Sequence, residues 1–293
     1  MKRHHLLATA ALLAAIALPA SAGDPHGFLS NGSTLALRTY GKGAPVVIVA
    51  GGPGLDADYM TEVAQDVAAA GFEAVLPDLR GTGLSREAGN DLSMMSIAGS
   101  VADLEALRQS LGLDRLTLIG HSFGGGIIQA YAEAHPDRVA RLVLLDSAGT
   151  DLQPAPDQAM ALKWMERLSP AEKADYEAAR AKGDDTAMKM KFRATIANPA
   201  KAEAFVAGLR PIAAPAAAKA ISSDFRAHYQ MTVRDPAFPV WVIYGERDWI
   251  RGWQSQLAQA YPRASIRLIA DGGHFPWIDN PEETASALAA ALH

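Results

Sequence analysis

Residues 115–126, RLTLIGHSFGGG, join a run of apolar residues to a cluster of glycines, with Ser122 between them. The apolar run is typical of a buried strand, and residues 123–135 continue as a helix without any linker. Gly120 and Gly124 stand two positions either side of Ser122, where a sharp strand-to-helix turn leaves no room for side chains. Such a turn, a nucleophile elbow, lifts the serine hydroxyl above the edge of a sheet and places it at a helix N-terminus.

Strand-length apolar runs alternate with helical stretches on both sides of this motif. The expected strands are 34–41, 45–52, 73–81, 115–122, 141–149, 238–248 and 265–275, and the expected helices are 59–70, 96–111, 123–135 and 281–292. Alternation of this kind predicts an α/β protein whose mostly parallel central sheet is flanked by helices.

The alternation stops between residues 150 and 235, where alanine, charged residues, methionine and proline predominate and no strand-like run appears. We interpret residues 150–235 as an inserted helical cap. The core is then formed by residues 23–149 and 236–293, because the strand pattern resumes after the insertion.

Composition excludes several functions. The chain has 293 residues, 49% of them hydrophobic, which is ample for one large core. Its formal net charge is -5 and no run of lysine or arginine marks a phosphate-binding face, so we expect no nucleic-acid partner. The absence of cysteine excludes disulfides and thiolate chemistry. No cluster of metal-ligating residues appears, so we expect neither a metal nor an organic cofactor.

The first 22 residues have the organisation of a secretory signal peptide. Lys2 and Arg3 form a basic start, residues 6–18 are an apolar run, and Ala20 and Ala22 frame a small-residue cleavage site. An uncleaved membrane anchor is the competing interpretation, but the apolar run is too short to span a bilayer comfortably. We therefore expect cleavage near Ala22, export to the periplasm or the extracellular space, and no stable membrane anchoring afterwards.

A serine hydroxyl is a poor nucleophile until a base takes its proton, and that base needs a carboxylate to orient it. Three histidines qualify by position: His121, His135 and His274. His121 adjoins Ser122 but points the other way along the turn, and His135 lies at the far end of the following helix. His274 follows a late strand in a glycine-rich loop, which gives the order serine, acid, histidine.

Two aspartates are candidates for the acid, because Asp146 and Asp248 each end a predicted strand before His274. Asp248 is preferred, since its loop returns to the same edge of the sheet as His274. Asp146 would more often cap a helix or a turn.

An oxyanion formed at Ser122 needs two hydrogen-bond donors. The backbone N–H of Phe123 is one, and the other should come from the loop AGGPGLD that follows an early strand. Pro53 has no N–H, so Gly51 or Gly52 must donate, and Gly52 is preferred.

These residues together resemble the α/β-hydrolase superfamily over nearly the whole chain after the signal peptide. Within it, GGPG at 51–54 and DLRGTGLS at 78–85 are similar to the proline iminopeptidase branch, although the nucleophile motif reads GHSFG, a form common among esterases and carbon–carbon bond hydrolases. The resemblance implies the α/β-hydrolase fold. It also implies catalytic roles for Ser122, Asp248 and His274, with oxyanion donors at Gly52 and Phe123.

The resemblance also implies roles for residues outside the catalytic group. Asp78 and Arg80 are expected to shape the loop beside the site. Peptidases of this branch hold the free amine of the substrate with cap glutamates, and Glu166 in LKWMERL (162–168) is the one position in the predicted cap that resembles them.

We therefore expect a serine hydrolase that forms an acyl-enzyme on a small ester or amide. A proline iminopeptidase, which removes proline from the N-terminus of a short peptide, is the alternative. A non-catalytic ligand-binding protein is a more remote one, since serine, acid, base and both oxyanion donors all have candidates.

Overall fold

The computed structural model describes residues 23, 25–152, 164–182, 185–232 and 234–293. The predicted signal peptide at 1–22 lies outside the described residues, as does the 153–163 part of the predicted cap. Within the described part of the chain, no helix is long and apolar enough to cross a membrane. Export and cleavage near Ala22 stay predictions.

In the described residues, eight strands form one sheet in the order β1-β2-β4-β3-β5-β6-β7-β8. β2 pairs antiparallel with both β1 and β4, and all other neighbouring strands are parallel. The bounds are β1 His26–Ser30, β2 Ser33–Gly41, β3 Pro45–Val49, β4 Glu73–Pro77, β5 Leu116–His121, β6 Val139–Leu145, β7 Val240–Gly245 and β8 Ser265–Ile269.

Helices cover both faces of the sheet. α1 (Thr61–Ala69) and α11 (Pro281–Leu292) pack on one face, and α2 (Ile97–Ser110), α3 (Phe123–Ala134) and α9 (Gln254–Ala260) pack on the other. The short helices are η1 Ala57–Met60, η2 Gly83–Asn90, η3 Leu92–Met94, η4 Pro136–Arg138, η5 Arg251–Trp253 and α10 Pro276–Asp279.

Strand β3 shows why a continuously apolar run belongs in the middle of such a sheet. Val47 and Val49 join the hydrophobic cluster of α2 and α3, whereas Val46 and Ile48 join the cluster of α1 and α11. Successive side chains of a strand point to opposite faces, so a strand covered by helices on both sides must be apolar throughout.

The predicted fold class is confirmed, and the differences concern the ends of elements. Several strands stop earlier than the apolar runs: 73–81 becomes Glu73–Pro77, and 265–275 becomes Ser265–Ile269. The residues after each strand turn into loops at the carboxyl edge of the sheet. β1 and α9 were not predicted. β1 is a short antiparallel edge strand that contains Gly27, which weakens its strand signal.

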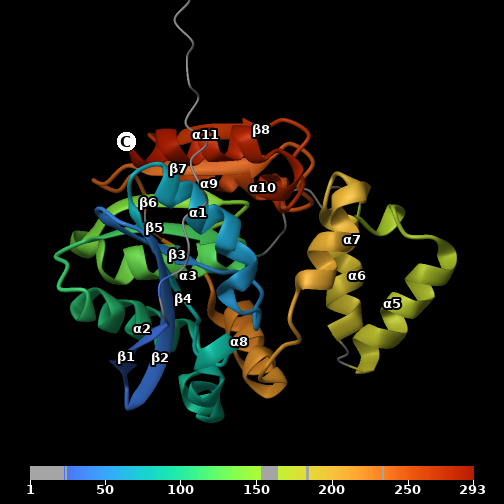
Figure 1. Cartoon of the computed structure of the whole chain (residues 1–293), viewed down its shortest axis with the longest axis horizontal. Coiled ribbons are helices and arrows are strands. Elements are labelled where there is room, and N and C mark those ends of the chain that lie inside the picture. Colours follow the sequence, from blue (N-terminus) through green and yellow to red (C-terminus); the bar gives the residue numbers. More distant parts are fainter. Residues whose placement is uncertain (1–22, 24, 153–163, 183–184, 233) are drawn as a thin grey trace, which may run out of the picture.

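Among the described residues between β6 and β7 lie the helices α5 (Pro170–Lys182), α6 (Asp185–Thr195), α7 (Pro199–Gly208) and α8 (Pro215–His228). Figure 1 shows α5, α6 and α7 standing to one side of the sheet. α8 contributes Ile221 and Phe225 to the hydrophobic cluster of α2 and α3, whereas α6 contributes Phe192 and α7 contributes Ala202 and Val206 to the cluster of α1 and α11. Helices within the predicted cap range therefore share both hydrophobic clusters of the core. The limits of the cap at 150 and 235 stay a prediction.

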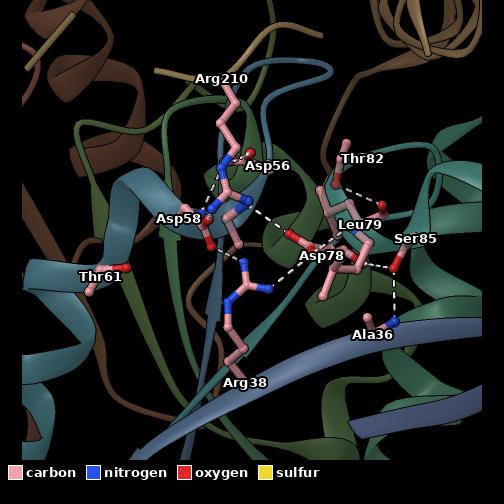
Figure 2. Close-up of polar contacts among 12 residues, drawn as sticks. Ala36, Arg38, Asp56, Asp58, Thr61, Asp78, Leu79, Thr82, Ser85 and Arg210 are labelled. Carbon is pink, nitrogen blue, oxygen red and sulfur yellow. Dashed lines mark hydrogen bonds and ion pairs between the residues drawn. The ribbon is translucent and has the colours of Figure 1, made fainter. Parts of the chain in front are cut away.

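Asp78 holds together the loops that follow β3 and β4 (Figure 2). It is buried, and its carboxylate accepts hydrogen bonds from the N–H groups of Ala57 and Leu84, each at 2.9 Å, and from Arg38 at 3.2 Å. The Ser85 hydroxyl donates to the Asp78 carbonyl oxygen at 2.9 Å. The first and last residues of the DLRGTGLS motif thus fix loop geometry, in agreement with the structural part expected for Asp78.

Two arginines form further ion pairs around these loops. Arg80 forms a buried ion pair with Asp103 of α2, with an Nη2 to Oδ1 distance of 2.6 Å. Arg210, which lies between α7 and α8, pairs with Asp58 at 2.5 Å and with Asp56 at 3.8 Å (Figure 2). Asp58 also pairs with Arg38, so the linker before α8 is tied to the loop that follows β3.

Candidate active site

Ser122 stands at the turn between β5 and α3 in a conformation that few non-glycine residues adopt, with φ 55° and ψ -119°. The two flanking glycines are required by close contacts. A Cβ on Gly124 would lie 2.2 Å from the carbonyl oxygen of Val49, and one on Gly120 would lie 2.7 Å from the carbonyl oxygen of Gly124. The helix therefore starts directly against β3, as the spacing of the glycines predicts.

The structure brings Ser122, His274 and Asp248 into one hydrogen-bonded line. Ser122 Oγ lies 3.0 Å from His274 Nε2, and His274 Nδ1 lies 3.0 Å from Asp248 Oδ1. The three residues follow β5, β8 and β7, so they meet at the carboxyl edge of the sheet, where open α/β sheets bind ligands. Asp248 and His274 are buried, which removes water from the acid and base.

His121 has a separate structural part. It is buried, its Nε2 donates to the carbonyl oxygen of His274 at 2.8 Å, and its Nδ1 accepts from the Tyr59 hydroxyl at 2.9 Å. Burial lowers the pKa of His121 well below its usual range, with a further contribution from His274, so the ring is neutral and can accept at Nδ1. His135 lies at the other end of α3, remote from the serine, where its ring contacts that of Tyr131 at a tilted angle.

The same contacts decide between the two candidate oxyanion donors. The N–H of Gly51 donates to the Tyr59 hydroxyl at 2.5 Å and is therefore occupied. The N–H of Gly52 makes no hydrogen bond to any of the described residues in this structure. Gly52 and Phe123 line one cavity together with Ser122 and His274. Their role as oxyanion donors stays a prediction.

This cavity, which we call the serine cavity, has a volume of about 310 Å³. Its walls come from the elbow, the loop after β7, and helices α6 and α8, and they include Lys191, Arg226, Trp249 and Trp253. Lys191 and Arg226 are not identified by sequence, because no motif distinguishes them from the other basic residues. Only the packing of α6 and α8 in the structure brings them to the cavity. Glu166 lies elsewhere, in a second cavity of about 560 Å³ that shares only Trp249 with the first.

Asp146, the other candidate acid, lies behind Asp248. Its Oδ1 accepts from the N–H of Gly245 at 2.8 Å, and ligand atoms of Asp146, Asp248 and His274 all lie within 4.8 Å of one another. Burial and then the nearby charge of Asp248 raise the pKa of Asp146 well above its usual range. The second carboxyl oxygens of both aspartates lack any other partner among the described residues. When protonated, the Asp146 carboxyl group can therefore donate a hydrogen bond to the carboxylate of Asp248 and hold it in position.

Comparison with known proteins identifies the family. Residues 44–281 match the family described as alpha/beta hydrolase fold, and the chain belongs to that family of enzymes. It is 27% identical over 279 residues to 2-hydroxymuconate semialdehyde hydrolase from Pseudomonas putida, covering 90% of this chain and 95% of that protein. The resemblance inferred from the motifs is confirmed.

Two solved structures share the fold. A proline iminopeptidase-related protein from Thermus thermophilus superposes with a TM-score of 0.72 at 25% identity, covering 92% of this chain and 96% of that one. A thermophilic esterase from Thermogutta terrifontis superposes with a TM-score of 0.68, covering 92% and 98%. At 21% identity the esterase shows a common fold alone.

Substitution of Asp146 tests whether it acts as a protonated donor. In Asp146→Asn the amide oxygen can still accept from the N–H of Gly245, and the amide NH2 can donate to the carboxylate of Asp248. We therefore expect kcat/KM within about threefold of the wild type. Asp146→Ala removes the donor to a charged group, a contact that contributes roughly 1.5 to 3 kcal/mol, so we expect a loss of about tenfold or more. Alanine also fits poorly at the φ of 42° found here, so melting temperatures must accompany the kinetics. An asparagine variant as impaired as the alanine variant would show that Asp146 is needed as an anion.

Proposed function

We propose that the protein is a serine hydrolase that forms an acyl-enzyme on a small ester or amide. The observation that carries this proposal is the line of two 3.0 Å contacts from Ser122 through His274 to Asp248, opening into a cavity beside two backbone N–H groups. Ser122 attacks the substrate carbonyl carbon while His274 accepts its proton, and Asp248 stabilises the resulting imidazolium. The N–H groups of Gly52 and Phe123 bind the oxyanion.

The second half of the cycle uses the same groups in reverse. His274 returns the proton to the leaving alcohol or amine, and the acyl group stays on Ser122. A water molecule then attacks the acyl-enzyme with His274 as base, which releases the acid and regenerates the serine. The chain's own residues supply every proton transfer in this scheme.

The charges of the serine cavity favour an ester over a free N-terminal proline. A proline iminopeptidase must hold a protonated amine, which calls for carboxylates near the serine. Among the described residues, the lining of this cavity includes Lys191 and Arg226 and no aspartate or glutamate. A cationic substrate would be repelled there. The peptidase remains the second candidate, because the GGPG and DLRGTGLS motifs and a structural relative favour it.

We further propose that residues 1–22 direct export and are removed, so that the mature chain begins at Gly23 and works in the periplasm or outside the cell. The support is the basic start, apolar run and small-residue site in the sequence. Intact mass of the exported protein tests this, since a retained N-terminus would contradict it.

Parallel turnover of 4-nitrophenyl acetate and an unblocked proline 4-nitroanilide separates the two candidates. We expect the mature enzyme to cleave the acetate and leave the anilide intact, with Ser122→Ala reducing ester turnover by at least about 10³-fold. Fast anilide cleavage that disappears when the amine is acylated would establish the peptidase instead. Near-full ester turnover by Ser122→Ala would refute the serine mechanism itself.

A further inference from the structure

Lys191 of α6 brings a positive charge into the serine cavity. Its Nζ lies 3.9 Å from the centroid of the Trp249 ring, and its side chain lines the cavity together with Ser122 and His274. Among the described residues, no ion pair and no hydrogen bond of this ammonium group is found, and the carboxylate that acts on it electrostatically is that of Asp248. Burial lowers its pKa to about 8, although the charge of Asp248 acts in the opposite direction.

Arg226 of α8 adds a second cation to the same cavity. Its Nε donates to the carbonyl oxygen of Ser222 at 3.2 Å and its Nη2 donates to the Ser222 hydroxyl at 2.5 Å, so only neutral acceptors contact its guanidinium. The side chain is otherwise exposed, which places it at the mouth of the cavity while Lys191 lies further in. No carboxylate balances the two charges among the described residues of the lining.

An unpaired cation beside the reacting serine needs an explanation. Placing an ammonium group where water is partly excluded raises its free energy unless an anion or hydrogen-bond acceptors accompany it. The Trp249 ring offers only a cation–π contact, and a methionine or leucine would fill the same space without that penalty. A ligand anion would complete the set of charges.

We propose that the substrate carries a carboxylate in addition to its ester or amide bond, and that this carboxylate binds Lys191 with Arg226 at the mouth of the cavity. The inference rests on the proposed hydrolase function and names its substrate class. The protein as a whole carries a net charge of -5, which repels an anion, so local cations are required to hold one.

Two aryl esters of similar length test the proposal in the mature protein. The anionic probe is 4-nitrophenyl hydrogen glutarate and the neutral probe is 4-nitrophenyl hexanoate. We expect the wild type to prefer the glutarate in kcat/KM. Lys191→Met should lower kcat/KM for the glutarate by about tenfold or more and leave the hexanoate within about twofold, because only the charged substrate loses a partner.

Two further variants serve as controls. Lys191→Arg keeps the charge and should retain most of the preference for the glutarate. Lys189→Met removes a lysine from the same helix that does not line the serine cavity, and should change neither substrate.

The preference should also depend on pH in a predictable direction. Lys191 is protonated below about pH 8 and neutral above it, so the ratio of glutarate to hexanoate kcat/KM should fall as the pH rises through 8. The charged and titratable groups around Lys191 are Asp248 and His274 of the catalytic loops, Arg180 of α5 and Arg226 of α8. Both substrates are attacked by the same serine with the same base, so effects on the catalytic groups cancel in the ratio. In Lys191→Arg the ratio should stay flat.

The outcomes separate the inference from the function on which it rests. A wild type that cleaves the hexanoate well and the glutarate poorly would overturn the carboxylate-bearing substrate and leave the serine hydrolase intact. Equal losses on both esters in a folded Lys191→Met protein would assign Lys191 a structural part and also overturn the inference. Failure to cleave either ester would count against the proposed function itself.

Discussion

The site depends on how closely the elbow approaches strand β3. Gly124 leaves room for the carbonyl oxygen of Val49, which would lie 2.2 Å from any Cβ at that position. Because α3 starts against β3, Phe123 at the start of the helix and Gly52 in the loop after β3 line the same cavity as Ser122. Any side chain larger than hydrogen would push the helix away from β3 and separate the two donors. Ser122 itself has a φ of 55°, a backbone conformation that costs free energy for a residue with a Cβ.

The charged groups of the site lie in two places: carboxyl groups behind His274 and cations in the serine cavity. Behind His274 lie two buried carboxyl groups, Asp248 and Asp146, and burial and then the charge of Asp248 raise the pKa of Asp146. The serine cavity also presents Lys191 and Arg226. In the proposed reaction the imidazolium of His274 forms beside Asp248, and the oxyanion forms beside the N–H groups of Gly52 and Phe123. Lys191 and Arg226 act instead on the carboxylate proposed for the substrate.

Much of this arrangement could be predicted from sequence because it depends on local signals. The elbow needs glycine at fixed spacing, and the parallel strands bring the residues that follow them, Asp248 and His274, to one edge. Sequence alone favours Gly52 over Gly51, but the physical reason needs the structure, since the N–H of Gly51 donates to the hydroxyl of Tyr59 on a different element. Lys191 was missed for a similar reason: its position depends on how α6 packs against the loop after β7, and no local pattern records that contact.

The most direct test of the account is covalent labelling of the mature protein with an aryl or alkyl fluorophosphonate, read by intact mass and by sequencing of the modified peptide. The phosphonate mimics the tetrahedral species and reacts with a serine only where a base and oxyanion donors activate it. The account predicts one adduct per chain, on Ser122, that forms far more slowly in a His274→Ala variant. An adduct on another residue, or unhindered ester turnover with no adduct at all, would contradict it.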